Sequence, residues 1–294
     1  MEENTEFVEY LSSQPNLKDL SKRTYTSHYV KLRNALGEDL KDCDEEDIVD
    51  YLDGLRDDGY SINSYLNYLR TATNVRIFHR AHTNHLETVK INMIAVKEHN
   101  RAANNRSIIE AGIPTCGEIE AHLDLAFNEG RWRDYIILYL IIKYHTRNID
   151  IDVAIVRDIK LAKNDKVNFL VAKASHINFI RNNYKTKERY GRKSFSIKNK
   201  KFMASVNYLL EEIGDSGDKY YWLLADKNNQ HIRPDSVQKY ISRTTLNGVG
   251  TNIYNKSYVT YAVKSCDVAL LKSISERRGT AVNTLLQAYD LHAK

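Results

Sequence analysis

The sequence is poor in proline, glycine and cysteine, and each shortage excludes a class of protein. Three prolines and twelve glycines interrupt 294 residues. These two residues are the usual breakers of regular structure, so long and mostly helical elements are expected. The three cysteines, Cys43, Cys116 and Cys266, are odd in number and far apart, and no CxxC pair occurs. Neither a disulfide framework nor a zinc site is therefore indicated, and a reducing compartment is expected.

The sequence also lacks segments that would direct a chain into a membrane. The acidic stretch 1–11 has no signal-peptide core. The most apolar run, 134–144, is too short to span a bilayer and predicts a buried helix. We therefore expect an intracellular protein without a membrane partner, located in the cytoplasm or nucleus of a host or in a virion.

The remaining composition is that of a soluble globular protein. Hydrophobic residues make up 42% and charged residues 28% of the chain, whose length suits two domains. The net charge of +5 is a mild indication of a nucleic-acid partner.

Hydrophobic periodicity predicts a helical domain at 1–100, a linker at 101–114 and a second domain at 115–294. Capping boxes are expected at Asp44 with Asp47 and at Thr115 with Glu118. The predicted fold class is mainly α with a small β-sheet. Helices are expected at 20–37, 44–59, 61–80, 85–99, 114–127, 132–146, 200–214, 233–245, 256–265, 268–279 and 283–292, and strands at 166–174, 177–184 and 193–197.

A dense basic segment extends from Arg181 to Lys201 and is opposed only by Glu188. Lysine and arginine at this density on a hairpin would bind a polyanion with salt-sensitive affinity. The alternative is an ordinary solvated hairpin. The expected DNA contacts are Arg181, Lys187, Arg189, Arg192 and Lys193, together with Lys256 further along the chain.

Arg147 stands in an apolar and aromatic segment and is followed by Asp150 and Asp158. One interpretation is a structural arginine paired with one of these acids. The other is a phosphate-binding arginine that a carboxylate holds in place.

The stretch "TRNIDIDVAIVRDI" resembles the first box of the tyrosine recombinase, or phage integrase, family, with Arg147, Asp150 and Asp158 at the matching positions. Residues 21–80 are similar to the family's core-binding domain in helix order and spacing. The resemblance implies a tyrosine recombinase catalytic-type domain at 115–294.

Two further segments continue the resemblance. "NNYKTKERYGRKSFSI" resembles the turn that carries the family's catalytic lysine, which implies Lys185, with Lys187 as the alternative. "RRGTAVNTLLQAYDLH" resembles the last box, and implies that Tyr289 is the nucleophile. Thr280, nine positions earlier, stands where the family has histidine or tryptophan.

The second box departs from the family pattern of His-x-x-Arg. The best match places Asn252 at the histidine and Asn255 at the arginine, and a shifted alignment places Tyr258 at the arginine. Asparagine donates hydrogen bonds but supplies no charge. Nearby basic residues that could replace the missing charge are Lys256, Arg277 and Arg278.

The resemblance implies breakage and rejoining of double-stranded DNA through a phosphotyrosine, without metal, cofactor or small-molecule substrate. The degenerate positions leave two alternatives open: a descendant kept for DNA binding, and an all-helical structural or interaction protein such as a virion component. Because the chain ends soon after Tyr289, we expect a monomer that associates only on DNA. A mobile element or a large DNA virus is the expected source.

Overall fold

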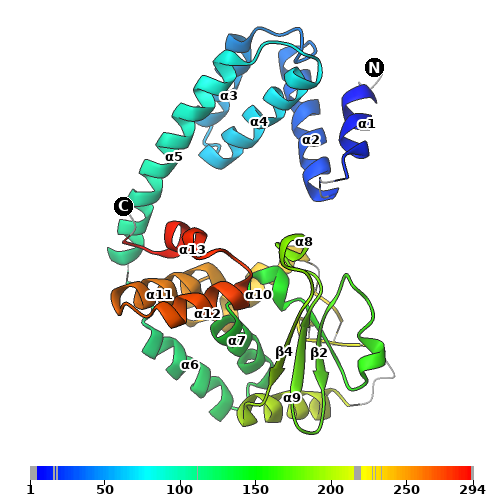
Figure 1. The fold of residues 1–294 in the computed structure, drawn as a ribbon, viewed down its shortest axis with the longest axis vertical. Helices are drawn as coiled ribbons and strands as arrows, with labels where there is room; N and C mark the ends of the chain where they lie inside the picture. Colours follow the sequence, from blue (N-terminus) through cyan, green and yellow to red (C-terminus); the bar gives the residue numbers. More distant parts are fainter. Residues whose placement is uncertain are drawn as a thin grey trace. The chain divides into compact units, whose positions relative to one another are not determined.

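The computed structural model describes residues 5–15, 17, 19–110, 112–214, 220–226, 228, 230–232 and 234–292. The chain forms two compact units, residues 1–104 and 105–294. Figure 1 shows the first unit in blue to cyan and the second in green to red. The boundary between them lies inside one long helix, α5 (Asn84–Glu110).

The first unit is helical, as predicted, and packs around one apolar core. Tyr29, Leu52 and Leu69 are among its fully buried side chains. The Ser61 hydroxyl caps its helix by accepting a hydrogen bond from the Ser64 nitrogen at 3.1 Å. Its helices are α1 (Thr5–Ser13), α2 (Asp19–Leu36), α3 (Glu45–Asp57), α4 (Ile62–Phe78) and the first part of α5.

Two local expectations for this region are wrong. Asp44 does precede α3, but its side chain accepts no capping hydrogen bond. Of the expected linker 101–114, residues up to Glu110 continue α5. The segment after residue 100 lacks a hydrophobic period, but it forms helix because alanine, arginine and glutamate have high helix propensity. No glycine interrupts it before Gly112.

The second unit contains a small mixed sheet with strand order β4-β3-β2-β1-β5. Strands β1 and β2 pair in parallel, with Val153 opposite Asn168, whereas the other pairs are antiparallel. The three predicted strands are confirmed. The sequence did not predict β1, because its four residues are all buried and show no alternation. The strands are β1 (Val153–Val156), β2 (Asn168–Ala172), β3 (Ile177–Arg181), β4 (Lys193–Ile197) and the short β5 (Tyr221–Trp222).

Helices lie beside the sheet and complete the mainly α fold that was predicted (Figure 1). Thr115 and Glu118 form the expected capping box, with 3.2 Å from the Glu118 nitrogen to the Thr115 hydroxyl. Helix α11 begins at Thr251 rather than at Lys256. The helices are α6 (Cys116–Asn128), α7 (Trp132–Tyr144), α8 (Lys187–Tyr190), α9 (Lys200–Ile213), α10 (Pro234–Thr244), α11 (Thr251–Lys264), α12 (Val268–Arg278) and α13 (Val282–Tyr289), with short 3-10 turns η1 (Asn148–Ile151), η2 (Ile159–Leu161) and η3 (Leu246–Gly248).

Helix α7 is the buried centre of this unit. Every residue from Tyr135 to Ile142 is at most 8% exposed. The run 134–144 is therefore a core helix, as predicted. In the part of the chain that the structure describes, we found no helix with the length and apolar character needed to cross a bilayer.

Candidate functional site

A cavity of about 390 Å³ in the second unit brings together side chains from distant parts of the sequence. Four of them were predicted as site residues: Arg147, Lys185, Asn252 and Tyr289. Arg278, one of the three basic candidates for the missing charge, also lines the cavity. The remaining lining residues are Asn148, Ile149, Gln238, Gly250 and Thr251.

The turn between α7 and β1 positions Arg147. His145 ends α7 with a left-handed backbone (φ 50°), and Arg147 then precedes η1. The backbone N–H of Arg147 donates to the Asp150 carboxylate at 2.9 Å, whereas the Arg147 guanidinium donates to the Thr280 hydroxyl at 2.7 Å. Asp150 thus fixes the turn, and Thr280 orients the side chain that enters the cavity.

The same Asp150 carboxylate forms a buried ion pair with Arg181. Their atoms lie 2.7 Å apart, and neither side chain is exposed. We expected Arg181 among the DNA contacts, but in this position it cannot reach DNA. The reason is that strand β3 turns Arg181 inward, toward the only carboxylate that the described residues bring to it.

Asp158, the second acid expected to support Arg147, lies elsewhere. It is exposed, and its carboxylate accepts a hydrogen bond from the Lys160 nitrogen at 2.8 Å at the start of η2. Strand β1 separates it from the turn that carries Arg147, so Asp150 alone of the two acids holds that turn.

Lys185 lies between two anchored neighbours in the connection from β3 to β4. Tyr184 is buried, and the Thr186 hydroxyl donates to the Gly279 carbonyl at 2.7 Å. Lys187, the alternative to Lys185, instead donates to the Asp165 carbonyl at 3.0 Å. Lys185 is therefore the lysine that lines the cavity.

Three cationic side chains cap the carboxyl end of α12. Lys193 donates to the Glu276 carbonyl, Arg181 to that of Arg277, and Arg147 to that of Arg278 at 3.3 Å. Cations are stabilising at this end of a helix because its last carbonyls lack partners and carry partial negative charge. This arrangement ties α12 to the hairpin and to the Arg147 turn.

Arg278 connects α12 to the expected nucleophile. It is fully buried, and its guanidinium donates to the His145 carbonyl at 2.8 Å and to the Tyr289 hydroxyl. The guanidinium carbon lies 4.5 Å from the centre of the Tyr289 ring. Burial lowers the pKa of Arg278, and the neighbouring Tyr289 opposes this shift.

The other two basic candidates for the missing charge lie outside this cavity. Lys256 donates to the Asn105 amide oxygen at 2.9 Å, and Arg277 donates to the Lys143 carbonyl at 2.5 Å. The sequence does not distinguish Arg277 from Arg278, because both stand at the end of one helix and either side chain could turn inward.

The two asparagines of the second box occupy different environments. Asn252 is exposed and lines the cavity. Asn255 is 1% exposed and donates to the Thr251 carbonyl of its own helix at 2.8 Å. Tyr258, the residue of the shifted alignment, donates to Glu120 at 2.7 Å. Neither alignment brings a cation from α11 into the cavity.

The predicted basic hairpin contains the short helix α8 between its strands. Arg189 and Arg192 are exposed in this connection, and the Arg189 guanidinium lies 5.4 Å from the centre of the Tyr190 ring. Lys193 is half-buried against α12. Of the expected DNA contacts in this segment, the exposed ones, Arg189 and Arg192, therefore lie on α8 and in the turn that follows it.

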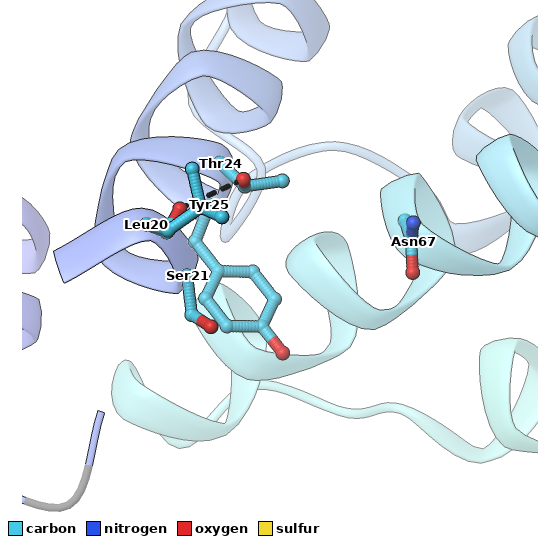
Figure 2. Close-up of a pocket in the computed structure, with 5 residues that line it drawn as sticks. All are labelled: Leu20, Ser21, Thr24, Tyr25 and Asn67. Carbon is cyan, nitrogen blue, oxygen red and sulfur yellow. Dashed lines mark hydrogen bonds between the residues drawn. The ribbon is translucent and has the colours of Figure 1, made fainter. Parts of the chain in front are cut away.

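A smaller hollow of about 230 Å³ lies in the first unit, between α2 and α4 (Figure 2). The Thr24 hydroxyl donates to the Leu20 carbonyl of its own helix at 2.8 Å. None of the residues drawn there carries a formal charge, so this hollow offers no anion site comparable with the one around Arg147. Its lining residues are Leu20, Ser21, Thr24, Tyr25 and Asn67.

Comparisons with known proteins give only remote similarity in structure. No family model and no curated protein matches the chain. Among solved structures, the chain is similar to the crystal structure of XerA recombinase, with a TM-score of 0.40 and 12% identity over 97% of this chain and 92% of that chain. A likeness this remote assigns the chain to no family.

Proposed function

We propose that the second unit breaks and rejoins a DNA strand through a covalent bond to Tyr289. The observation that carries this proposal is the shared cavity of Arg147, Lys185 and Tyr289, which come from three segments far apart in the sequence. These are a guanidinium that can bind a phosphate, an ammonium that can give a proton, and a phenol that can attack.

In the proposed reaction, the Tyr289 oxygen forms a bond to phosphorus and the bond from phosphorus to the 5′ oxygen breaks. The phenolic proton leaves to solvent, and the Lys185 ammonium protonates the departing 5′ oxygen. Arg147 binds the non-bridging oxygens, where charge accumulates in the transition state. Attack by a 5′ hydroxyl on the phosphotyrosine reverses the steps, so the energy of the phosphodiester bond is retained.

Double-stranded DNA is the proposed partner because exposed cations lie on the hairpin that also supplies Lys185. Arg189 and Arg192 are exposed only a few residues from Lys185. Contacts from arginine to the DNA backbone position a protein on the duplex without reading its sequence. They would hold a phosphodiester near the cavity while the site acts on it.

Covalent trapping tests the proposal. The protein is incubated with nicked DNA, supercoiled DNA and random half-sites, then denatured, and DNA-linked protein is measured. Tyr289→Phe removes the attacking oxygen and should abolish the adduct. Tyr261→Phe is the matched control, because Tyr261 is 53% exposed on α11 and is not a lining residue of the cavity.

An adduct that persists in Tyr289→Phe would show that another residue attacks. Salt-sensitive binding without an adduct on any of these DNAs would favour the alternative, a protein kept for holding DNA.

A further inference from the structure

Among the residues that the structure describes, the charges around the cavity do not balance. Arg147, Arg181 and Arg278 carry three positive charges, and the carboxylate among them is that of Asp150. The Arg147 side chain is 16% exposed, and Asp150 and Arg181 are 0% exposed. The Arg181 guanidinium lies 2.7 Å from the Asp150 carboxylate, whereas the Arg147 guanidinium lies 4.0 Å from the same oxygen. Buried charge without a counterion is costly, so this arrangement favours an anion.

Arg278 is the guanidinium that touches the atom expected to react. It donates to the Tyr289 hydroxyl and to the His145 carbonyl, while its Nε has no partner among the described residues. When phosphorus bonds to the phenolic oxygen, its non-bridging oxygens come next to this donor. Arg278 would then exchange a hydrogen bond to a neutral hydroxyl for one to an anion, which is stronger.

We infer that Arg278, the last residue of α12, is a catalytic residue that supplies the second phosphate-binding guanidinium of this site. It takes the place of a cation on α11, where Asn255 is buried and uncharged. Arg147 and Arg278 would flank the phosphate, and the Arg147 guanidinium donates to the Arg278 carbonyl, so the end of α12 helps to place Arg147. This inference rests on the proposed function for the reaction, but its anion site can be tested separately.

A purely structural role predicts different behaviour. Arg278 does hold the α7 end through the His145 carbonyl. A structural arginine would therefore lower the melting temperature when replaced but leave the adduct rate of the folded fraction unchanged. A phosphate-binding arginine controls that rate, because it stabilises charge in the transition state.

The first test compares adduct formation in wild type, Arg278→Lys, Arg278→Ala and Lys272→Ala. Lys272 is exposed on the same helix and serves as the control for loss of a positive charge. We expect Arg278→Ala to lower the rate about 10²–10³-fold, as for loss of one oxyanion donor. Arg278→Lys should lower the rate of adduct formation less than Arg278→Ala does. Free guanidinium ion, but not urea, should restore part of the rate in Arg278→Ala. An unchanged rate in folded Arg278→Lys and Arg278→Ala would overturn the inference.

The second test needs no reaction. The melting temperature of the full chain is measured with increasing inorganic phosphate, with chloride at equal ionic strength as the reference. We expect phosphate to raise it in wild type and in Lys272→Ala, and much less in Arg147→Lys and Arg278→Lys. A phosphate effect lost in Arg147→Lys but intact in Arg278→Lys would overturn the role of Arg278. Failure of wild type to form an adduct, with this phosphate pattern present, would overturn the proposed function and keep the anion site.

Discussion

The carboxylate of Asp150 accepts a hydrogen bond from the Arg181 guanidinium at 2.7 Å, with neither side chain exposed to solvent. The same oxygen accepts the backbone N–H of Arg147 at 2.9 Å. One buried carboxylate therefore joins strand β3 to the turn that carries the candidate phosphate-binding arginine. Removing one partner of such a pair leaves the other charge buried without compensation.

We therefore predict that Asp150→Asn destabilises the second unit by about 3–5 kcal/mol. Urea unfolding followed by tryptophan fluorescence measures this, because both tryptophans, Trp132 and Trp222, lie in that unit. Arg181→Met should also destabilise the second unit. The double variant should lose less free energy of unfolding than the sum of the losses in the two single variants. A midpoint for Asp150→Asn equal to that of wild type would contradict the prediction.

Features that depend on neighbouring residues could be predicted from the sequence. The Thr115 and Glu118 capping box, the buried run of α7 and the three longer strands are all confirmed. The sequence did not predict that α5 continues to Glu110. Its last residues favour helix but show no hydrophobic period, and this pattern was interpreted as a linker.

Features that depend on distant partners could not be predicted in this way. The density of cations in 181–201 does not show that Arg181 turns inward, since its partner Asp150 stands 31 residues earlier. The Arg278 carbonyl accepts a hydrogen bond from the Arg147 guanidinium, which stands 131 positions earlier. The resemblance implied Arg147, Lys185 and Tyr289, whereas Arg278 was one of three basic candidates for the missing charge. Only the folded chain shows that Arg278 is the candidate that lines the cavity.

Gly279 provides a second test, of the contact between α12 and the Lys185 connection. Its φ is +67°, and an added Cβ would lie 3.1 Å from the Thr186 hydroxyl and 3.2 Å from the Tyr184 ring. Gly279→Ala should cost about 1–2 kcal/mol for the left-handed backbone and should also displace the segment that carries Lys185. We expect slower adduct formation and a lower melting temperature.

The control for Gly279→Ala is Gly37→Ala, because Gly37 also has positive φ (+78°) but nothing within 4 Å of an added Cβ. It should show backbone strain alone, with the adduct rate unchanged. Equal adduct rates in Gly279→Ala and Gly37→Ala would show that the packing of Gly279 against Thr186 does not position Lys185.

His145 should make the second unit sensitive to acid. Burial, reinforced by the charges of Arg278 and Arg277, lowers the pKa of His145 from 6.5 to about 3. Between these two values the unfolded chain binds one proton more than the folded chain, so stability is present above pH 6.5 and is lost as the pH falls. Once the pH is below the unfolded pKa, the loss approaches about 1.4 kcal/mol per pH unit.

Urea unfolding at a series of pH values from 7 to 4 measures this effect. His145→Asn removes the titrating group while asparagine tolerates the left-handed backbone of this position (φ 50°). Its stability should fall less steeply with pH than that of wild type. His292→Asn, at an exposed histidine of the same unit, should keep the wild-type dependence. Parallel curves for wild type and His145→Asn would show that His145 is not the buried neutral group.

The surface cations of the hairpin can be counted by the salt dependence of DNA binding. For duplex DNA, the slope of log K against log salt concentration should become shallower by about 0.9 for each phosphate that the protein no longer neutralises. Arg189→Ala with Arg192→Ala should therefore reduce the slope by about 1.8 if both exposed side chains bind phosphates. Lys264→Ala with Lys272→Ala removes the same charge from exposed positions on α11 and α12 and should change the slope less. Equal reductions in the two double variants would mean that net charge, rather than the hairpin, governs binding. A reduction confined to the hairpin variant would place the DNA backbone next to Lys185, as the proposed reaction requires.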